Sequence, residues 1–431
     1  VLTHEPVFAA IVTDPGQIRQ ILTNGKNDFH KGPNIFRFRY AIGDGTATSK
    51  LPADGSTYYA PLPSLQAFCS HKRKAIAPAF YPSKREFYTD LIHQLTKTYL
   101  ADRHHNEVRD LYEDMGGLML CIATNCLFGR TAGAPIVAAG DFVRASYEAV
   151  DEQIRTGGQT STDVFDRGDH ASDPDWRWQS NESESLLRKR RHLVHEAVEF
   201  LLRTPPLDAH RQDDLISLLR TTRYKDTGET MSDAQLLTSL IGLIFASYEN
   251  SAATAAWTLW CLANDPARLE RAKTEISQVL GNESVQGTDI DKLVYVQACV
   301  NESLRLYPPV WSMARETRHA VQLGDTHIPA NSVLFLSPWV QHRREAVWPD
   351  AHLFRPERFL NSLPPHMGDF FPFGMGPRSC IGKAFGLWEL TLVVATILKD
   401  WHITPAKGHA EPTPMLRATQ RPEPGVYLQW S

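Results

Sequence analysis

The sequence predicts a mainly α-helical protein with a small β region. Apolar residues recur with helical spacing over long stretches, above all at 232–264 and 291–306. Strand-like runs are few and short, and most of them gather between residues 321 and 336. The chain has 431 residues, 42% of them hydrophobic and 22% charged, which is typical of a globular protein with a large core. Length alone would allow two or three domains.

The first segment is interpreted as a short strand at 7–12 followed by a helix. Asp14-Pro15 supplies a helix N-cap and a first-turn proline. Residues 33–66 are rich in Gly, Pro and Ser, which indicates irregular surface or a lid. A helix beginning near Leu65 carries the basic run 71–74, most of which we interpret as a solvated face.

A long helical run crosses the middle of the chain. Residues 232–235 have the spacing of a capping box, and the run continues to about Asn264, roughly 45 Å at the α-helical rise. Before it, the polar stretch 156–185 contains two tryptophans. We interpret this stretch as a mobile lid or insertion, with disorder as the alternative. Helices from about Asp265 and over 291–306 follow.

The β portion comes after these helices. Strands are expected at 321–323, 327–328 and 333–336, with a turn at Gly324-Asp325 between the first two. One more strand is expected at 426–430, after an apolar helix at 384–398.

Charge and cysteine usage exclude several classes of protein. The net charge of -4 does not favour nucleic acid as a partner. The six cysteines (69, 121, 126, 261, 299 and 380) form no Cys-x-x-Cys pair, which argues against a zinc site and a disulfide framework. We therefore expect a reducing, cytoplasmic setting and a soluble protein, since no apolar run is long enough to span a bilayer. The chain begins at Val1 rather than Met, which leaves open an N-terminal truncation and the loss of a membrane anchor with it.

One cysteine stands in a setting suited to a metal ligand. Cys380 lies in a glycine-rich loop directly before the apolar helix at 384–398, and free amides at a helix N-terminus favour a thiolate. Arg378 is placed to reach a carboxylate on a cofactor, and Phe373 to cover the sulfur. A buried structural cysteine is the alternative. Three glycines would let the backbone approach the sulfur and a flat cofactor: Gly374, Gly376 and Gly382.

The full pattern Phe-x-x-Gly-x-Arg-x-Cys-x-Gly resembles the haem loop of the cytochrome P-450 haem-thiolate superfamily. The resemblance runs over nearly the whole chain. It implies a single domain over residues 1–431 with the cytochrome P-450 fold. It also implies a haem b whose iron is ligated by Cys380, with O2 binding opposite the sulfur. The thiolate donates electron density that favours O–O cleavage in this family.

Two further motifs of the family are present. Glu302-Ser303-Leu304-Arg305 places an acid and a base three residues apart on one helix face, where a surface salt bridge is the alternative interpretation. Pro356-Glu357-Arg358-Phe359 follows at the family's separation. The resemblance therefore assigns Glu302, Arg305 and Arg358 to a buried network that retains the haem.

The resemblance also implies basic partners for the two haem propionates. The matching positions are Arg73, Arg315 and Arg378, although Arg318 lies close to the second of them. The family often has Trp four residues before Arg73, where this chain has Cys69. That departure puts one propionate contact in question.

The distal helix departs most from the family. Ala246-Ser247-Tyr248-Glu249-Asn250-Ser251 aligns with Ala/Gly-Gly-x-Asp/Glu-Thr-Thr, so Glu249 keeps the acid while Asn250 replaces the usual threonine. An amide holds a water but relays protons poorly. Ser247 and Thr254 share the helix face of Asn250, whereas Ser251 is rotated by about 100°. We predict that Asn250 positions a distal water and Ser247 supplies a hydroxyl. An ordinary polar residue near a cavity is the alternative for Asn250.

The resemblance implies a monooxygenase that inserts one oxygen atom into a lipophilic substrate. No flavin or dinucleotide site is found, so electrons would come from a ferredoxin or flavodoxin with its reductase, or from a flavoprotein reductase, docked on the basic residues 72–74 and 378–383. The loop at 366–371 and the stretch 156–185 are expected to set specificity. We expect a monomer. Pocket-lining side chains are expected at Phe245, Ala246, Val310 and Met313, with core packing as the alternative.

Two rival functions remain open. Members of the family that lack the distal threonine include enzymes that rearrange peroxides, couple aromatics or use peroxide, and Asn250 keeps such a reaction in view. A haem sensor or carrier without catalysis is the other. The acid Glu249 and the polar stretch at 156–185 favour an enzyme.

Overall fold

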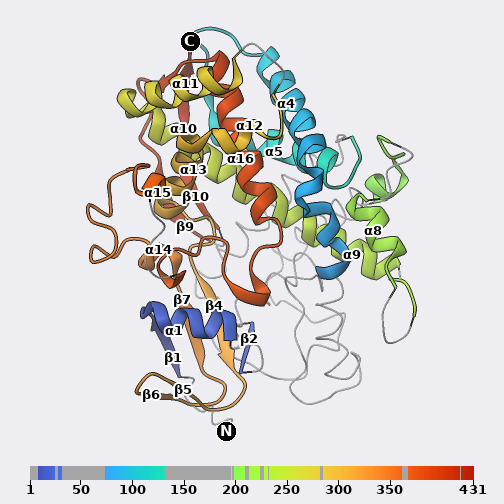
Figure 1. Ribbon diagram of the computed structural model, residues 1–431, viewed down its shortest axis with the longest axis vertical. Coiled ribbons are helices and arrows are strands. Elements are labelled where there is room, and N and C mark those ends of the chain that lie inside the picture. Colours follow the sequence, from blue (N-terminus) through green and yellow to red (C-terminus); the bar gives the residue numbers. More distant parts are fainter. Residues whose placement is uncertain are drawn as a thin grey trace, which may run out of the picture.

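The computed structural model describes residues 8–24, 28–31, 73–131, 196, 199–208, 213–223, 228–231, 233–281, 285–361, 367–417 and 419–431. These residues form a helical body with a smaller sheet region at one end (Figure 1). The predicted fold class is therefore confirmed. The predicted lid at 156–185, the first capping-box residue Ser232, Cys69 and Lys72 all lie outside the described residues.

The helical body is built from seven long helices among the described residues. They are α4 (Arg85–Ala101), α5 (Leu111–Cys126), α9 (Asp233–Ser247), α10 (Glu249–Ala263), α11 (Pro266–Leu280), α13 (Val294–Leu306) and α16 (Lys383–Asp400). Local signals explain their ends. Before α11, for example, Asp265 accepts a hydrogen bond from the N–H of Arg268 at 3.0 Å, and Pro266 occupies the first turn.

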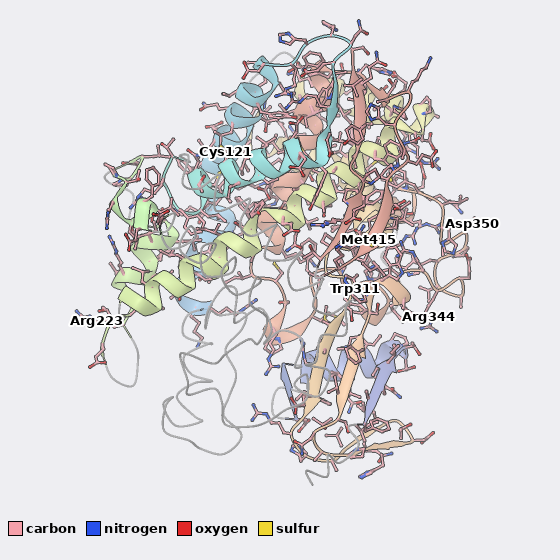
Figure 2. The ribbon with its side chains drawn as sticks, turned by 180° about the vertical axis from the view of Figure 1, so that it is seen from behind. Cys121, Arg223, Trp311, Arg344, Asp350 and Met415 are labelled. Atoms are coloured by element: carbon pink, nitrogen blue, oxygen red, sulfur yellow. The ribbon has the colours of Figure 1, made fainter. Side chains whose placement is uncertain are left out.

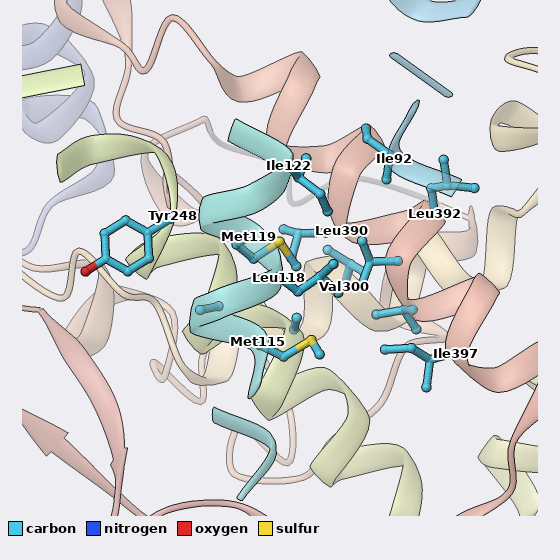
Figure 3. Close-up of a cluster of buried hydrophobic side chains, with 14 of the residues drawn as sticks. Ile92, Met115, Leu118, Met119, Ile122, Tyr248, Val300, Leu390, Leu392 and Ile397 are labelled. Atoms are coloured by element: carbon cyan, nitrogen blue, oxygen red, sulfur yellow. The ribbon is translucent and has the colours of Figure 1, made fainter. Parts of the chain in front are cut away.

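The core lies where α10 and α16 pass through the body. Helix α10 presents small residues at 252, 253, 255 and 256, which allow the neighbouring α5 to approach closely. Figure 3 shows the apolar side chains that meet there, among them Met119 of α5, Val300 of α13 and Leu390 of α16. Each side chain of this kind that is fully buried stabilises the fold by about 1.5–3 kcal/mol.

The sheet region brings together both halves of the chain. Its four strands run in the order β1 (Ala9–Val12), β7 (Val333–Leu336), β4 (Met313–Thr317) and β2 (Phe29–Lys31), with β1 parallel to β7 and the other pairs antiparallel. Asp14 caps the short helix α1 (Pro15–Arg19) by accepting from Gln17 N–H at 2.8 Å, as the sequence predicts. The π-helix η1 (Gln20–Asn24) continues from α1.

Smaller elements complete the described structure. Strands β3 (Val108–Asp110), β11 (Tyr427–Trp430) and β8 (Ile403–Pro405) form a second sheet. Two hairpins are formed by β5 (Val321–Leu323) with β6 (Thr326–Ile328), and by β9 (Thr413–Leu416) with β10 (Gln420–Glu423). The short helices are α8 (Leu215–Thr221), α12 (Asp289–Lys292), α14 (Pro338–Gln341) and α15 (Arg358–Asn361). None of the helices in the described ranges has both the length and the apolar character needed to cross a membrane.

The structure differs from the predicted elements in one long helix and in several short strands, since β2, β3, β4, β8, β9 and β10 were not predicted. The long helix predicted over 232–264 is two helices, because the chain leaves helical geometry at Tyr248, whose φ is -115°. No proline or glycine marks this break. Strand β4 was not predicted, since its buried positions include Arg315 and Thr317 and the usual apolar alternation is missing.

Candidate active site

The loop that carries Cys380 is closed by its own backbone. The N–H of Cys380 donates to the carbonyl oxygen of Phe373 at 2.8 Å, and the N–H of Gly374 donates to that of Phe371 at 2.9 Å. A short 3-10 turn, η6 (Gly376–Arg378), lies between them, and α16 begins three residues after the cysteine. Phe373 packs against the main core, so the loop is fixed at its base.

The loop glycines have separate roles. Gly376 has a φ of +68°, and a Cβ there would overlap the carbonyl oxygen of Leu22 in η1. The positive φ and the missing Cβ of Gly376 therefore allow the loop to pack on η1. Gly374 also has a positive φ, +65°. Gly382 is the glycine beside the sulfur, since a Cβ at that position would lie 3.9 Å from Cys380 Sγ and 3.5 Å from the ring of Phe80.

Opposing influences act on the Cys380 thiol. The residue is exposed at the surface of the described structure, while the packed chain behind the sulfur raises the pKa of the thiol by desolvation. The backbone N–H of Gly382 and the positive charges of Arg73 and Lys383 lower that pKa. The other four cysteines among the described residues are more enclosed than Cys380. A cation bound at the sulfur would add to the influences that favour the thiolate.

Three arginines gather around this loop. Arg73, in the helical stretch 73–76, is close enough for its charge to act on the sulfur. Arg378 donates to the carbonyl oxygen of Phe29 at 3.2 Å. Arg315 of β4 is buried and donates to the carbonyl oxygen of Ala314 at 2.9 Å. Burial and the nearby charge of Arg378 lower its pKa to about 10.

This donor set fits a haem. Within the described part of the chain, no carboxylate pairs with Arg315, so its buried charge lacks a counter-ion that a bound carboxylate would supply. Arg315 rather than Arg318 is the residue whose charge acts together with Arg378. The arrangement thus places one thiol beside three arginines, of which the buried Arg315 has no carboxylate partner among the described residues.

Glu302, Arg305 and Arg358 lie together in the interior. Arg305 forms two hydrogen bonds of 2.7 Å to the carboxylate of Glu302, and both side chains are fully buried. Arg358 Nε donates to Glu302 Oε1 at 3.3 Å. The remaining donors of Arg305 reach the carbonyl oxygens of His342, Ala351 and Leu353 at 2.8–3.1 Å. The network therefore pins the segment 342–353 to α13.

His342 connects this network to the cysteine loop, which the sequence did not predict. Its carbonyl oxygen binds Arg305, while its ring Nε2 accepts from the N–H of Phe371 at 3.0 Å. Burial and the charges of Arg305 and Arg343 lower the pKa of His342 to about 3, so the ring is neutral and can accept. Neither spacing nor periodicity signals this contact.

The distal residues stand on either side of the helix break. Ser247 is the last residue of α9, and its hydroxyl donates to Ile244 O at 2.9 Å. Glu249 and Asn250 open α10, so a shared face for Ser247 and Asn250 no longer follows from helix periodicity. Asn250 Oδ1 is buried and has no hydrogen-bond partner among the described residues. It is therefore an acceptor that a water or ligand can satisfy.

The two neighbours of Asn250 make contacts that the sequence did not reveal. Thr419 Oγ1 donates to Glu249 Oε1 at 2.9 Å, and Ser251 Oγ donates to Glu389 Oε2 of α16 at 2.8 Å. Of the expected pocket-lining residues, Ala246 and Val310 are exposed and Met313 is partly buried. The side chain of Phe245 lies outside the described structure.

Known proteins resemble this chain, some of them over nearly its whole length. Cyclooctat-9-en-7-ol 5-monooxygenase of Streptomyces melanosporofaciens is 26% identical over 405 residues, 94% of this chain and 82% of the relative. Cyclooctatin synthase of the same organism is 34% identical over 212 residues, 48% of this chain and 46% of that protein. Cytochrome P450 4A12B of Mus musculus is 26% identical over 438 residues, covering 97% and 80%. The family model named Cytochrome P450 matches residues 8–430. With Cys380 in its loop and the Glu302 network behind it, the chain belongs to the cytochrome P450 family of haem-dependent monooxygenases.

Proposed function

We propose that this protein uses a haem b to insert one atom of O2 into a lipophilic small-molecule substrate. The observation that carries the proposal is the position of Cys380, on a closed loop before α16 and beside the cationic surface of Arg73, Arg315 and Arg378. Cys380 would ligate the iron, and the arginines would bind the haem carboxylates. When bound, the haem supplies the activation of O2, which the thiolate assists by donating electron density.

On the distal side we assign proton handling to Glu249 and water placement to Asn250. The buried Oδ1 of Asn250 accepts a hydrogen bond from a water, and the carboxyl group of the adjacent Glu249 takes part in proton transfer close by. Ser247 is proposed to supply the hydroxyl group. Its oxygen can still accept a hydrogen bond while its hydrogen is donated to Ile244 O.

Electrons would come from a separate protein, a ferredoxin or flavodoxin with its reductase or a flavoprotein reductase. Lys74 and Lys383 are exposed, each next to a residue whose charge or backbone acts on Cys380, and Arg378 bonds Phe29 of β2. These positive charges support docking of an acidic partner on this face.

The carbon monoxide difference spectrum of the reduced protein tests the ligand assignment. We expect a Soret band with the red shift of thiolate ligation, lost in Cys380→His because the sulfur is gone. Cys121→Ser is the matched control, since Cys121 is partly exposed on α5 and far in sequence from the loop. A wild-type spectrum without the red shift, or an unchanged spectrum in Cys380→His, contradicts the proposal.

Asn250 supports a second candidate, a haem-thiolate reaction without hydroxylation such as peroxide rearrangement, aromatic coupling or peroxygenation. Turnover under isotope-labelled O2 separates the two, and a product without label rules out the monooxygenase. For a monooxygenase, Asn250→Thr is expected to raise the fraction of reducing equivalents recovered in product, and Ser247→Ala to lower it. If neither variant changes that fraction, the distal assignment is wrong.

A further inference from the structure

The turn before β10 reaches into the distal side of the site. Thr419 precedes β10 and is 7% exposed, and its hydroxyl donates to Glu249 Oε1 at 2.9 Å across 170 residues of sequence. Glu249 is itself 3% exposed. A hydrogen bond of a hydroxyl to a buried carboxyl group is among the stronger polar contacts in a protein.

The chain on both sides of Thr419 is anchored. Gln420 N–H donates to Pro309 O at 2.8 Å. With its amide oriented to satisfy both neighbours, the Gln420 side chain accepts from Trp257 Nε1 at 3.1 Å and donates to Tyr307 O at 3.2 Å. The rings of Trp257 and Tyr307 stack at 3.9 Å with an interplanar angle of 5°. The turn is therefore fastened to α10 and to the segment that follows α13.

A second anchor lies before the turn. Trp311 Nε1 donates to the carbonyl oxygen of Arg417, and Trp311 lies close to β9 and its residue Met415 (Figure 2). Backbone groups at 417 and 420 are thus both bonded, so contacts to other segments lie on either side of Thr419.

The opposite side of Glu249 is closely packed. A cavity of about 10 Å³ lies between α5 and the helix break, lined by Tyr112, Gly116, Tyr248, Glu249 and Ala252. That volume is at the lower limit for one water molecule. The orientation of the carboxyl group therefore depends on protein contacts more than on solvent, and Thr419 supplies one of them.

We propose that Thr419 is a positioning residue for the distal acid, holding the carboxyl group of Glu249 beside Asn250 in the orientation that supplies protons during turnover. The inference rests on the proposed function. Without the Thr419 hydroxyl, Glu249 stays at the same position, but its carboxyl group is no longer held in this orientation. The effect then falls on kcat and on the yield of product per reducing equivalent, and KM stays unchanged.

Thr419→Val, which keeps the side-chain shape, tests the proposal in the haem-loaded protein. We expect kcat to fall about tenfold, the value of one lost hydrogen bond of this strength, with a larger solvent deuterium isotope effect. Thr419→Ser should restore both quantities. Thr413→Val is the matched control on the same hairpin, because its hydroxyl bonds only Glu423 O at 3.2 Å in an exposed position.

A double-mutant cycle with Glu249→Gln identifies the route of the effect. If Thr419 acts through Glu249, Thr419→Val has no further effect on kcat in the Glu249→Gln background. Additive losses, or a rise in KM at constant kcat, overturn the proposal. The stretching frequency of carbon monoxide on the reduced haem gives a readout without turnover, and we expect Thr419→Val to shift it only when Glu249 is present.

The wild-type protein separates this inference from the proposed function. An unlabelled product or a missing Soret shift counts against the function itself. A labelled product together with an additive cycle counts against Thr419 alone. The carbon monoxide spectrum also reports the folded, haem-loaded fraction of each variant, by which kcat is normalised.

Discussion

Glu389 shows how far a single buried residue can depart from its usual state. It lies on α16, is 1% exposed, and receives a hydrogen bond from Ser251 of α10. Burial raises the pKa of its carboxyl group from 4.5 to about 8, and Ser251 opposes that rise only in part. At neutral pH the group is therefore largely protonated and joins the helix that follows the cysteine loop to the helix that carries Asn250.

The pH dependence of unfolding tests this state. Because the pKa is higher in the folded protein, Glu389 contributes stability that is fully present below about pH 4.5 and is lost as pH rises through 8. In Glu389→Gln we expect that decline to disappear, a change in slope of up to about 1.4 kcal/mol per pH unit.

Denaturant unfolding between pH 5 and 8.5 measures the slope for each variant. Glu411→Gln is the control, because the side chain of Glu411 is exposed and its replacement should leave the wild-type slope unchanged. Equal slopes for wild type and Glu389→Gln would show that the buried carboxyl group does not titrate in this range.

Several residues at this scale could not be found from the sequence. Cys380, Arg378 and Glu302 stand in local patterns whose spacing reveals them. Thr419, Glu389 and His342 act through partners that are between 29 and 170 residues away, and no local period encodes such contacts. A buried polar residue among apolar neighbours is the one available signal, and Glu389 within an apolar helix gives it.

At the scale of elements, the site depends on how a few segments are joined. Two hydrogen bonds connect the end of the short helix α14 to the segment before the cysteine loop. Gln341 Nε2 donates to Asp369 Oδ1 at 2.9 Å, and His342 Nε2 accepts from Phe371 N–H. Through Arg305, the same segment is tied to α13. The Glu302 network therefore supports the cysteine loop indirectly, through α14.

Breaking this network should cost much more than breaking a surface one. Glu302→Gln leaves Arg305 with a buried, uncompensated charge, and we expect a loss of about 3–5 kcal/mol in the free energy of unfolding together with weaker haem retention. Glu357→Gln is the matched control. Glu357 pairs with Arg268 and Arg271 near the surface, where the expected loss is about 1 kcal/mol or less.

Denaturant unfolding and the rate of haem transfer to an acceptor protein measure the two effects. If Glu302→Gln and Glu357→Gln lower the free energy of unfolding by similar amounts, burial of the Glu302 network does not increase its contribution to stability. A loss of stability without faster haem transfer would separate the network from the cofactor.

The element boundaries show where prediction from sequence succeeds and where it fails. The N-cap at Asp14 and the start of α11 at Pro266 follow from side chains that act on their own backbone. The break at Tyr248 does not, because residues 233–263 carry an apolar helical pattern on both sides of it. Next to the break, Glu249 and Ser251 are each held by another element, and no local pattern reveals these contacts.

At the scale of the whole molecule, one apolar core joins the long helices while the sheet region holds a second, smaller core. Ile18, Leu22 and Phe371 belong to that smaller core, which also includes Met375 of the cysteine loop. The fold class could be predicted because helical periodicity covers most of the chain. The joining of β1 to β7 could not, since short strands carry no information about their partners.

The seat of the cysteine loop has a consequence for how the protein is made. Gly376 rests on Leu22, and Arg378 bonds Phe29 across 349 residues. Leu22 and Phe29 are therefore synthesised early, whereas the loop that packs on them is synthesised near the end of the chain. The loop can pack on these residues only after nearly the entire chain has been made. Haem has no finished site to enter during most of synthesis, so cofactor uptake is one of the last steps in the maturation of this protein.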